Sequence, residues 1–542
     1  MPVRSRASLL ALLLGAALFS SAGNRGSEAA KILAVPADWS HWIIMKTLLL
    51  ELVASGHQVT VLRSNDSRGL ETTSEDFTLE TILVPAAQAY RARNASEIRD
   101  IVFNSLYVED GFLSSLAAAR SMYASLLFNN EMTIPAIRAL FDDRALLQRL
   151  KGAGFDLTLA DPYHAAGAML AQVLGTPLVF FGRWMITGDL HFNLAPSPLS
   201  FVPVVNSRLS DRMSVWERMK NVLIYGMSRF TSYFYIYPAY NELCRRYLDS
   251  DITVEELYAK ADMVLMKVDF AFDYPRPTMP NLVYIGGVQC SAGRPLSAEL
   301  QRFMDGSGDQ GVVIFSLGSV VSIYPPELAT ELAAGLARLP QRVVWRLVGD
   351  APSTLGNNTK VMSWLPQNDL LSHPKTRAFI THGGENGLYE AIYHGVPLVG
   401  IPVLFDQYDN LLRLKTRGAA IMLDLAHLTS DVIFQAVKTV IETPSYGENM
   451  KRISTLHRDV PLEPKELAVF WIEYTIRHRG AAHLGAAGTE LPFYQYYLLD
   501  VIAILVAVST LALYLACKLL IFLLVKMHSV GRRTRTKLKK VD

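Results

Sequence analysis

Short apolar runs alternate with segments of helical apolar spacing along most of this chain of 542 residues, and this alternation limits its fold more than any other feature. Strands that are separated by helices pair in parallel and bury both faces of their sheet. We expect strands at 31–36, 58–62, 157–160, 177–181, 312–315, 343–347, 378–381 and 398–402, and helices at 42–55, 165–174, 327–339, 385–394 and 432–443. Two consecutive sets of this kind predict an α/β fold with two doubly wound, Rossmann-like domains.

A stretch rich in proline separates the two sets. Residues 272–277 read Phe-Asp-Tyr-Pro-Arg-Pro and break the periodicity. We expect this stretch to link an N-terminal domain at 31–280 to a C-terminal domain at 281–490. Within the first domain, residues 219–237 are dense in apolar and aromatic side chains. Two interpretations of them stay open: ordinary core helices, or a surface that receives apolar substrates and dips into lipid.

Both ends of the chain carry membrane-targeting patterns. Residues 1–22 combine early arginines, an apolar run and small residues, a pattern typical of a cleaved secretory signal. Residues 498–525 are apolar over a length that spans a bilayer, and the tail at 526–542 is strongly basic. Because basic tails stay in the cytoplasm, we expect a type I single-pass membrane protein whose body lies in the lumen.

The charge distribution excludes the broad basic surface of a nucleic-acid binder. The chain has a net charge of +2, and the tail alone contributes more than that excess. Lys539 and Lys540, close to the C-terminus, resemble a di-lysine retrieval signal and predict the endoplasmic-reticulum membrane. Glycosylation sequons at Asn65, Asn94 and Asn357 fit a luminal body. The 3 cysteines lack metal-ligand spacing. No metal is expected either from the segments that carry the candidate site, because they contain no Asp-x-Asp motif.

One stretch of the second half groups side chains that suit a nucleotide. His382 ends an expected strand, and Gly384 opens a helix whose unpaired amides can hold a diphosphate. Asn386 adds a donor in the first turn of that helix. Glu390 follows four residues later and can accept bonds from two ribose hydroxyls, while Trp364 offers a flat face for a base.

The spacing of this stretch resembles the nucleotide-sugar signature of the UDP-glycosyltransferases. The signature positions, kept at their full spacing, are Trp364, Gln367, His382, Asn386, Glu390, Asp406 and Gln407. The resemblance covers nearly the whole chain, and the signal, single anchor and basic tail are similar to those of the vertebrate membrane-bound branch, the UDP-glucuronosyltransferases. It implies a GT-B fold in which the C-terminal domain binds the UDP-sugar donor and the N-terminal domain binds the acceptor.

The resemblance also implies a role for each residue of the donor site. It assigns, from base to sugar, Trp364 to uracil, Gln367 and Glu390 to the uridine, Ser316, His382 and Asn386 to the diphosphate, and Asp406 and Gln407 to the sugar hydroxyls. Arg346 resembles a family position near the nucleotide. No cofactor is implied, since the UDP-sugar is a co-substrate.

Two residues of the first half are candidates for acid–base chemistry. His41 falls at the start of an expected helix, where the dipole disfavours protonation and keeps the imidazole a competent base. Asp161 follows an expected strand, at the carboxyl end where open α/β sheets place ligands. The resemblance places both residues on the family's catalytic dyad, in which the aspartate orients the histidine.

These expectations combine into an inverting single displacement. His41 deprotonates an acceptor hydroxyl, which attacks C1 of the donor sugar as UDP leaves, and the product is a β-glycoside. Gln407 favours UDP-glucuronic acid as the donor, whereas Tyr408 is shared with the galactosyl branch. The aromatic-rich first half suits small lipophilic acceptors such as phenols, steroids and xenobiotics, with membrane lipid as a neighbour.

Two rival functions stay open. One is transfer of galactose or glucose from its UDP donor to a lipid such as ceramide. The other is a catalytically silent partner that regulates related transferases, for which loss of His41 or Asp161 would be the sign. A homo-oligomer, or a hetero-oligomer with related transferases, is compatible with either. A dinucleotide oxidoreductase is set aside because no G-x-G-x-x-G follows the first strand.

Overall fold

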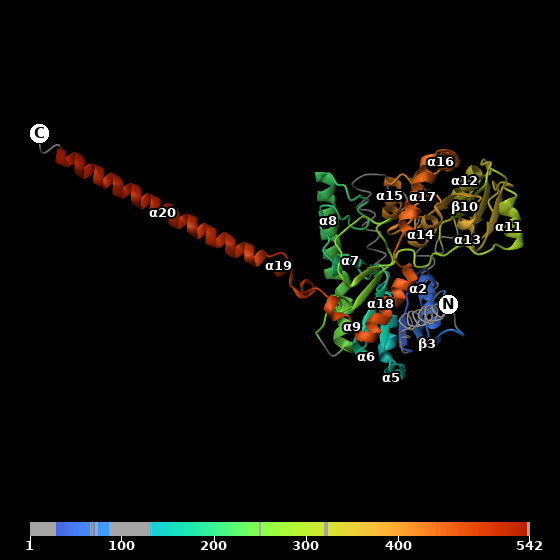
Figure 1. The fold of residues 1–542 in the computed structure, drawn as a ribbon, viewed down its shortest axis with the longest axis horizontal. Helices are drawn as coiled ribbons and strands as arrows, with labels where there is room; N and C mark the ends of the chain where they lie inside the picture. Colours follow the sequence, from blue (N-terminus) through green and yellow to red (C-terminus); the bar gives the residue numbers. More distant parts are fainter. Residues whose placement is uncertain are drawn as a thin grey trace, which may run out of the picture. The chain divides into compact units, whose positions relative to one another are not determined.

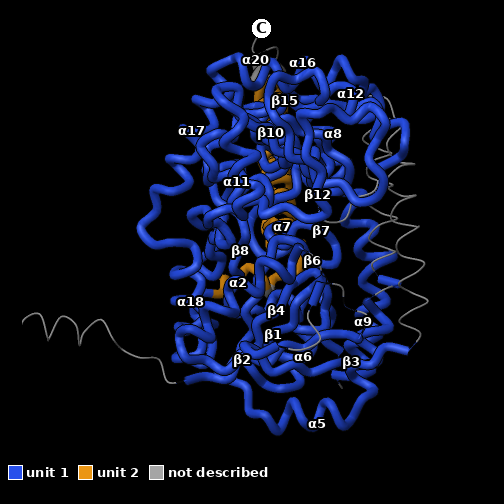
Figure 2. Tube along the Cα trace, turned by 90° about the vertical axis from the view of Figure 1, so that its right-hand side faces the viewer, with its two compact units in different colours: residues 1–484 blue, residues 485–542 orange. Residues whose placement is uncertain are grey.

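The computed structural model describes residues 29–38, 40–65, 67, 69–70, 74–85, 130–131, 133–248, 251–318 and 324–538. The expected signal at 1–22, the sequon at Asn94 and the lysines at 539–540 lie outside these residues. The chain divides into two compact units, residues 1–484 and residues 485–542, which Figure 2 colours separately.

The first unit contains two parallel sheets, as the alternation predicts (Figure 1). The N-terminal sheet has the order β3-β2-β1-β4-β5-β8-β9. Its strands are β1 Lys31–Val35, β2 Gln58–Ser64, β3 Thr78–Ile82, β4 Leu157–Ala160, β5 Leu178–Phe181, β8 Met263–Met266 and β9 Leu282–Tyr284. The strand order reverses between β1 and β4, so their carboxyl ends frame a crevice where open α/β sheets bind ligands.

Strand β1 shows why this sheet is covered on both faces. Ile32 and Ala34 point into one apolar core, which α2 covers, while Leu33 and Val35 point into a second core on the opposite face. The helices of this domain are α2 Ser40–Ala54, α5 Arg144–Ala153, α6 Ala166–Leu174, α7 His191–Leu194, α8 Val215–Thr231, α9 Tyr237–Tyr247 and α10 Val254–Ala259. A π-helical turn at Ser232–Ile236 joins α8 to α9, and a short ribbon pairs β6 Trp184–Met185 with β7 Gly188–Asp189.

The C-terminal sheet repeats the plan with the order β12-β11-β10-β13-β14-β15, all parallel. Its strands are β10 Val312–Ser316, β11 Arg342–Arg346, β12 Thr359–Met362, β13 Thr376–Thr381, β14 Leu398–Gly400 and β15 Ala420–Met422. The helices are α11 Ala298–Asp305, α12 Pro326–Ala337, α13 Gln367–Ser372, α14 Glu385–His394, α15 Gln407–Thr416, α16 Ser430–Glu442 and α17 Pro444–Arg458. Here the order reverses between β10 and β13, which frames a second crevice.

Two segments differ from the expected division of the body. Residues 272–277 connect β8 to β9 inside the N-terminal sheet, so the prolines mark a crossover loop rather than the passage between domains. Helix α18, Pro464–His478, packs on the N-terminal side, where Ala468 and Ile472 are buried in the core beneath α2 (Figure 1). The N-terminal layer therefore includes residues that a division at 280 and 490 assigns to the C-terminal domain.

The second unit consists of the short helix α19, Phe493–Tyr496, and the long helix α20, Leu499–Leu538. Within α20, Leu499–Arg532 is long and apolar enough to cross a membrane, and it is the candidate span found among the described residues. The expected apolar C-terminal helix of spanning length is confirmed, although the helix itself continues into the basic tail.

Candidate active site

His41 and Asp161 meet at the carboxyl edge of the N-terminal sheet. The first turn of α2 carries His41, and β4 ends one residue before Asp161. His41 Nδ1 lies 2.7 Å from Asp161 Oδ2, and the side chains are 20% and 1% exposed. The structure therefore brings together two residues that stand 120 positions apart in the sequence.

The surroundings of Asp161 keep its carboxyl group ionised. Burial raises the pKa of Asp161, but the His41 ring, the Lys267 ammonium and the backbone amide of Tyr163 outweigh it and hold that pKa below its usual value. An ionised Asp161 fixes the proton of His41 on Nδ1, which donates to the carboxylate. The Nε2 atom is then left as an acceptor for a hydroxyl proton.

A hydrogen bond joins the residue before His41 to the C-terminal domain. Asn386, in the first turn of α14, donates from Nδ2 to the carbonyl oxygen of Ser40 over 3.3 Å. Ser40 directly precedes His41, and the backbone oxygen of Asn386 accepts a bond from Gln289. Helix α14 therefore contacts the turn that carries His41.

Two glycines near the residues expected at the diphosphate lie against the His382 ring. Ser316 ends β10, and its hydroxyl oxygen accepts a bond from the Gly318 amide. A Cβ at Gly318 or at Gly384 would lie 2.5 Å from His382 Nε2, so both positions need glycine for the imidazole to fit between them. Burial lowers the pKa of His382 to about 4, with Arg346 adding to the effect, so the ring is neutral at pH 7. Its Nδ1 is buried and has no partner among the described residues, which suits a ligand at the start of α14.

Trp364 has the accessible ring that a stacked base requires. Its side chain is 59% exposed, and the Arg346 guanidinium lies 5.2 Å from the ring centre. Arg346 also donates to the carbonyl oxygen of Gly318. It therefore connects Trp364, which is expected to stack on uracil, to the loop expected at the diphosphate. Arg346 thus contacts both Trp364 and Gly318, and its role near a nucleotide stays a prediction.

The two residues expected at the uridine are paired with each other. Gln367, the first residue of α13, donates from Nε2 to Glu390 Oε2 on α14 over 2.6 Å. The structure therefore places both residues at one point between α13 and α14.

The two residues expected at the sugar are held by local hydrogen bonds. Asn410 donates to Asp406 Oδ2 over 2.6 Å and to the carbonyl oxygen of Gly383 over 3.2 Å. Gln407 Oε1 accepts from the backbone amides of Val403 and Leu404. Because this oxygen fixes its own loop, the group that Gln407 offers to a sugar is Nε2.

A buried ionic cluster, absent from the sequence expectations, joins the two domains behind the site. Arg183 Nη2 lies 3.3 Å from Asp189 and 3.1 Å from Asp273, and Arg183 Nη1 lies 3.7 Å from Glu385 at the start of α14. Arg413 Nε adds a bond of 2.7 Å to Asp273. The attraction of these arginines holds the pKa of Asp273 well below its usual value in spite of burial. Since the residues come from distant segments, no local pattern could reveal the cluster.

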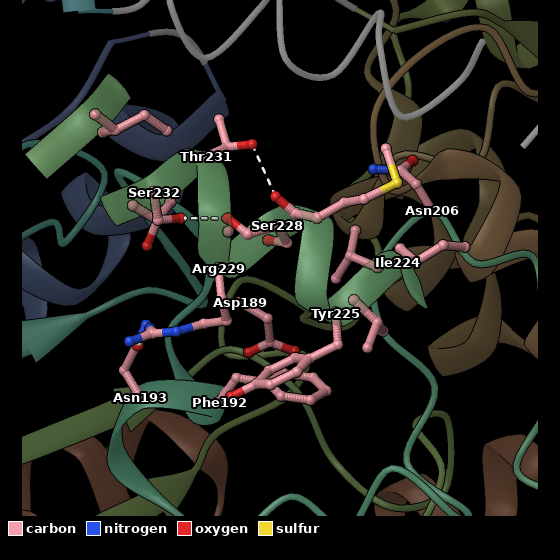
Figure 3. Close-up of a pocket in the computed structure, with 16 residues that line it drawn as sticks. Asp189, Phe192, Asn193, Asn206, Ile224, Tyr225, Ser228, Arg229, Thr231 and Ser232 are labelled. Carbon is pink, nitrogen blue, oxygen red and sulfur yellow. Dashed lines mark hydrogen bonds between the residues drawn. The ribbon is translucent and has the colours of Figure 1, made fainter. Parts of the chain in front are cut away.

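A pocket lies beside α8 in the N-terminal domain (Figure 3). The rings of Phe192 and Tyr225 pack 5.9 Å apart along it, and Ile224 adds an apolar wall. Asp189 lines the same pocket and connects it to Arg183 of the ionic cluster. Among the residues that the structure describes, no three His, Cys, Asp or Glu side chains are grouped as metal ligands.

Comparisons with known proteins show the family to which the chain belongs. Residues 30–534 match the family described as "UDP-glucoronosyl and UDP-glucosyl transferase". The chain belongs to this UDP-glycosyltransferase family. It is 41% identical over 495 residues to UDP-glucuronosyltransferase 1-2 of Mus musculus, covering 91% of each chain. It is 39% identical over 504 residues to UDP-glucuronosyltransferase 2C1 of Oryctolagus cuniculus, covering 93% of this chain and 100% of the relative.

Solved structures of glycosyltransferases share the fold. The calicheamicin glycosyltransferase CalG4 aligns with a TM-score of 0.56 and 17% identity, covering 83% of this chain and 99% of that one. A Phytolacca americana UGT2 complex with UDP-2fluoro-glucose and pterostilbene aligns with a TM-score of 0.53 and 17% identity, covering 82% and 99%. The predicted GT-B fold and family are confirmed, and the chain is an enzyme of the UDP-glycosyltransferase family. The roles of individual site residues stay predictions.

Proposed function

We propose that the chain transfers glucuronic acid from UDP-glucuronic acid to a hydroxyl group of small lipophilic acceptors such as phenols, steroids and xenobiotics. Relatives named UDP-glucuronosyltransferase, similar over nearly their whole length, support the choice of sugar. The observation that carries the proposal is the position of the base. Asp161 holds the His41 ring, and the residue before His41 accepts a bond from the donor signature at Asn386.

The proposed step is an inverting displacement. His41 Nε2 takes the proton of the acceptor hydroxyl, and Asp161 stabilises the imidazolium that forms. The acceptor oxygen bonds to C1 of the α-linked sugar while the bond from C1 to the diphosphate oxygen breaks, which gives a β-glucuronide and UDP. The start of α14 and a proton on the neutral His382 ring stabilise the negative charge of the leaving diphosphate. The step requires no metal ion.

The pocket beside α8 is the proposed acceptor site. Its apolar wall suits a phenol or steroid, and the contacts from Asp189 through Arg183 to Glu385 lead from the pocket to the start of α14.

The outer face of α8 is apolar too, with Trp216 at 76% and Phe230 at 56% exposed. We propose that this face lies against lipid. Brominated lipids should then quench part of the tryptophan fluorescence of the full-length protein in vesicles. Trp216→Phe should remove the quenched part of the signal.

The proposed location is the endoplasmic-reticulum membrane, with α20 as the anchor and the body in the lumen. The cluster of basic side chains after residue 525 supports this orientation. A lumenal body would meet lipophilic acceptors that partition into the same membrane.

Donor competition tests the proposal directly. Purified full-length protein would receive equal concentrations of UDP-glucuronic acid, UDP-galactose and UDP-glucose, with a pool of phenols, steroids and ceramide. We expect mainly β-glucuronides of the small acceptors. Galactosylated or glucosylated ceramide as the main product would replace the proposal with lipid glycosylation, and no product from any donor would favour a silent regulatory partner.

A further inference from the structure

Two residues that follow Gln407 hold a loop of the opposite domain. Asp409, on α15, accepts hydrogen bonds from the backbone amides of Asn206 and Arg208, over 2.6 Å to Oδ2 and 3.1 Å to Oδ1. The Arg208 guanidinium lies 4.4 Å from the centre of the Tyr408 ring. Asp409 is buried, at 7% exposed. Each carboxylate oxygen thus binds one amide of the 204–208 loop, a charge-assisted arrangement.

The loop has a backbone that needs such support. Asn206 has a φ of 63° and Arg208 a φ of 55°, which is the left-handed region that side chains other than glycine rarely adopt. Two such residues in one short loop persist only where surrounding contacts favour that conformation. The amides that Asp409 binds belong to these same two residues.

A second buried side chain holds the loop from its own domain. Asn221, on α8, is fully buried and accepts from the Val204 amide over 2.8 Å. Its Nδ2 donates to the carbonyl oxygens of Leu199 and Val202. The loop is therefore fixed at Val204 by the N-terminal domain and at 206–208 by the C-terminal domain.

The same loop forms part of the pocket beside α8. Val204, Val205 and Asn206 line it together with Ile224 and Tyr225, and Figure 3 shows Asn206 beside Ile224. A change in the position of the loop changes the shape of the pocket. Loss of the contact at Asp409 is therefore expected to change how a ligand binds in the pocket.

We propose that Asp409, together with Tyr408, is a positioning residue that couples the donor site to the acceptor pocket by fixing the 204–208 loop. Helix α15 begins at Gln407. Asn410, in its first turn, donates to Asp406 and to the carbonyl oxygen of Gly383, so this end of α15 is bonded to the turn that precedes α14 in the expected donor site. One helix end therefore contacts both sites. Donor and acceptor then change each other's affinity by the same factor. The identity of the pocket rests on the proposed function.

Amide hydrogen exchange of the full-length protein in detergent tests the contact itself. Asp409→Asn replaces a double acceptor with a group that has one acceptor and faces the second amide with a donor. Exchange at Asn206 and Arg208 should accelerate on the order of tenfold or more, while Val204, held by Asn221, keeps its rate. UDP should slow exchange at 206–208 in the wild type and not in the variant. Unchanged rates in Asp409→Asn would overturn the proposal.

Kinetics tests the coupling. Asp409→Asn should raise the acceptor KM at saturating donor on the order of tenfold and the donor KM at saturating acceptor by a similar factor, with a smaller change in kcat. Tyr408→Phe keeps a ring against Arg208 and should resemble the wild type, whereas Tyr408→Ala should share the defect. Asp431→Asn, which alters an exposed pair with Arg338, is the matched control. An unchanged acceptor KM in Asp409→Asn overturns the coupling, whereas absence of glucuronide from the wild type contradicts the proposed function instead.

Discussion

Gln367 Nε2 lies 2.6 Å from Glu390 Oε2 at the site expected to hold uridine. Burial raises the pKa of Glu390 to about 7, although the bond from Gln367 acts in the opposite direction. The free enzyme therefore has a partly protonated carboxyl group where two ribose hydroxyls are expected to donate. We therefore expect nucleotide binding and proton release to be linked at this residue.

Uridine binding should weaken as the pH falls below 7. Ribose hydroxyls donate to the ionised form of Glu390, so binding requires loss of the proton, and affinity decreases by up to about tenfold per pH unit. Calorimetry with uridine, which carries no phosphate to titrate, measures this dependence. Glu390→Gln should bind more weakly and with an affinity that does not change between about pH 5 and 8. A wild-type affinity independent of pH would contradict the prediction.

His41→Ala should reduce kcat by about 10²–10⁴-fold, because the acceptor hydroxyl loses its general base. UDP binding should persist, since the expected donor contacts lie in the other domain. Asp161→Asn should also lose activity because the amide no longer fixes the Nδ1 proton of His41. Turnover assays with calorimetric UDP binding as the control for folding measure both variants. Wild-type turnover in His41→Ala would remove the dyad from the mechanism.

Gln407→Glu separates two roles of one side chain. The variant keeps an oxygen that accepts from the Val403 and Leu404 amides, but it loses the Nε2 donor and adds a negative charge. We expect UDP-glucuronic acid to lose more affinity than UDP-galactose, because its carboxylate is repelled. Gln407→His should shift preference in the same direction while also releasing the loop. Competition between the two donors gives the ratio, and equal losses for both would show that Gln407 does not select the sugar.

Asp273→Asn should lower the free energy of unfolding by about 3–5 kcal/mol at pH 7, because it removes the buried negative charge that Arg183 and Arg413 share. The pKa of Asp273 lies below its usual 3.8 when folded, since the attraction of Arg183 and Arg413 outweighs burial. The unfolded chain then binds more protons in acid, so this stabilisation is present above about pH 4 and is lost as the pH falls. Denaturant unfolding in detergent measures it. Asp431→Asn, at an exposed site, should change stability by less than about 1 kcal/mol.

Protease added to sealed microsomes should remove a C-terminal tag and leave the body intact, because the basic tail is expected in the cytoplasm. Replacing Lys539 and Lys540 with serine should allow part of the protein to leave the endoplasmic reticulum. Immunoblotting and cell fractionation measure these outcomes. A protected tag would reverse the orientation, and unchanged retention would remove the di-lysine interpretation.

Most of the strands and helices that position the site could be predicted because each follows a strong local pattern. Helices α13 and α15, which begin at Gln367 and Gln407, are not among the expected helices. The expected strand at 157–160 and helix at 385–394 have the bounds that the structure gives them. The partners of α18 could not be predicted, because its apolar stripe fits any apolar layer. Only the assembled chain brings that helix to the N-terminal sheet.

The candidate site likewise has a part that could be predicted from the sequence and a part that could not. Motif spacing predicts which residues surround a nucleotide, and the Gln367–Glu390 pair is compatible with that assignment. The hydrogen bonds that Gln407 Oε1 accepts from the Val403 and Leu404 amides depend on the turn of its own loop, which motif spacing does not predict. The contact between Asp409 and the loop at Asn206 joins positions 203 residues apart, and no periodicity records such a contact.

Helix α18 has a consequence for exchanging parts between related enzymes. Its residues are encoded after the C-terminal sheet, yet Ala468 and Ile472 complete the core beneath α2. A hybrid made by a single crossover near residue 284 would pack one parent's helix against the other parent's sheet. Acceptor-binding halves therefore recombine cleanly only through two crossovers, with residues 464–484 inherited from the same parent as the first 284.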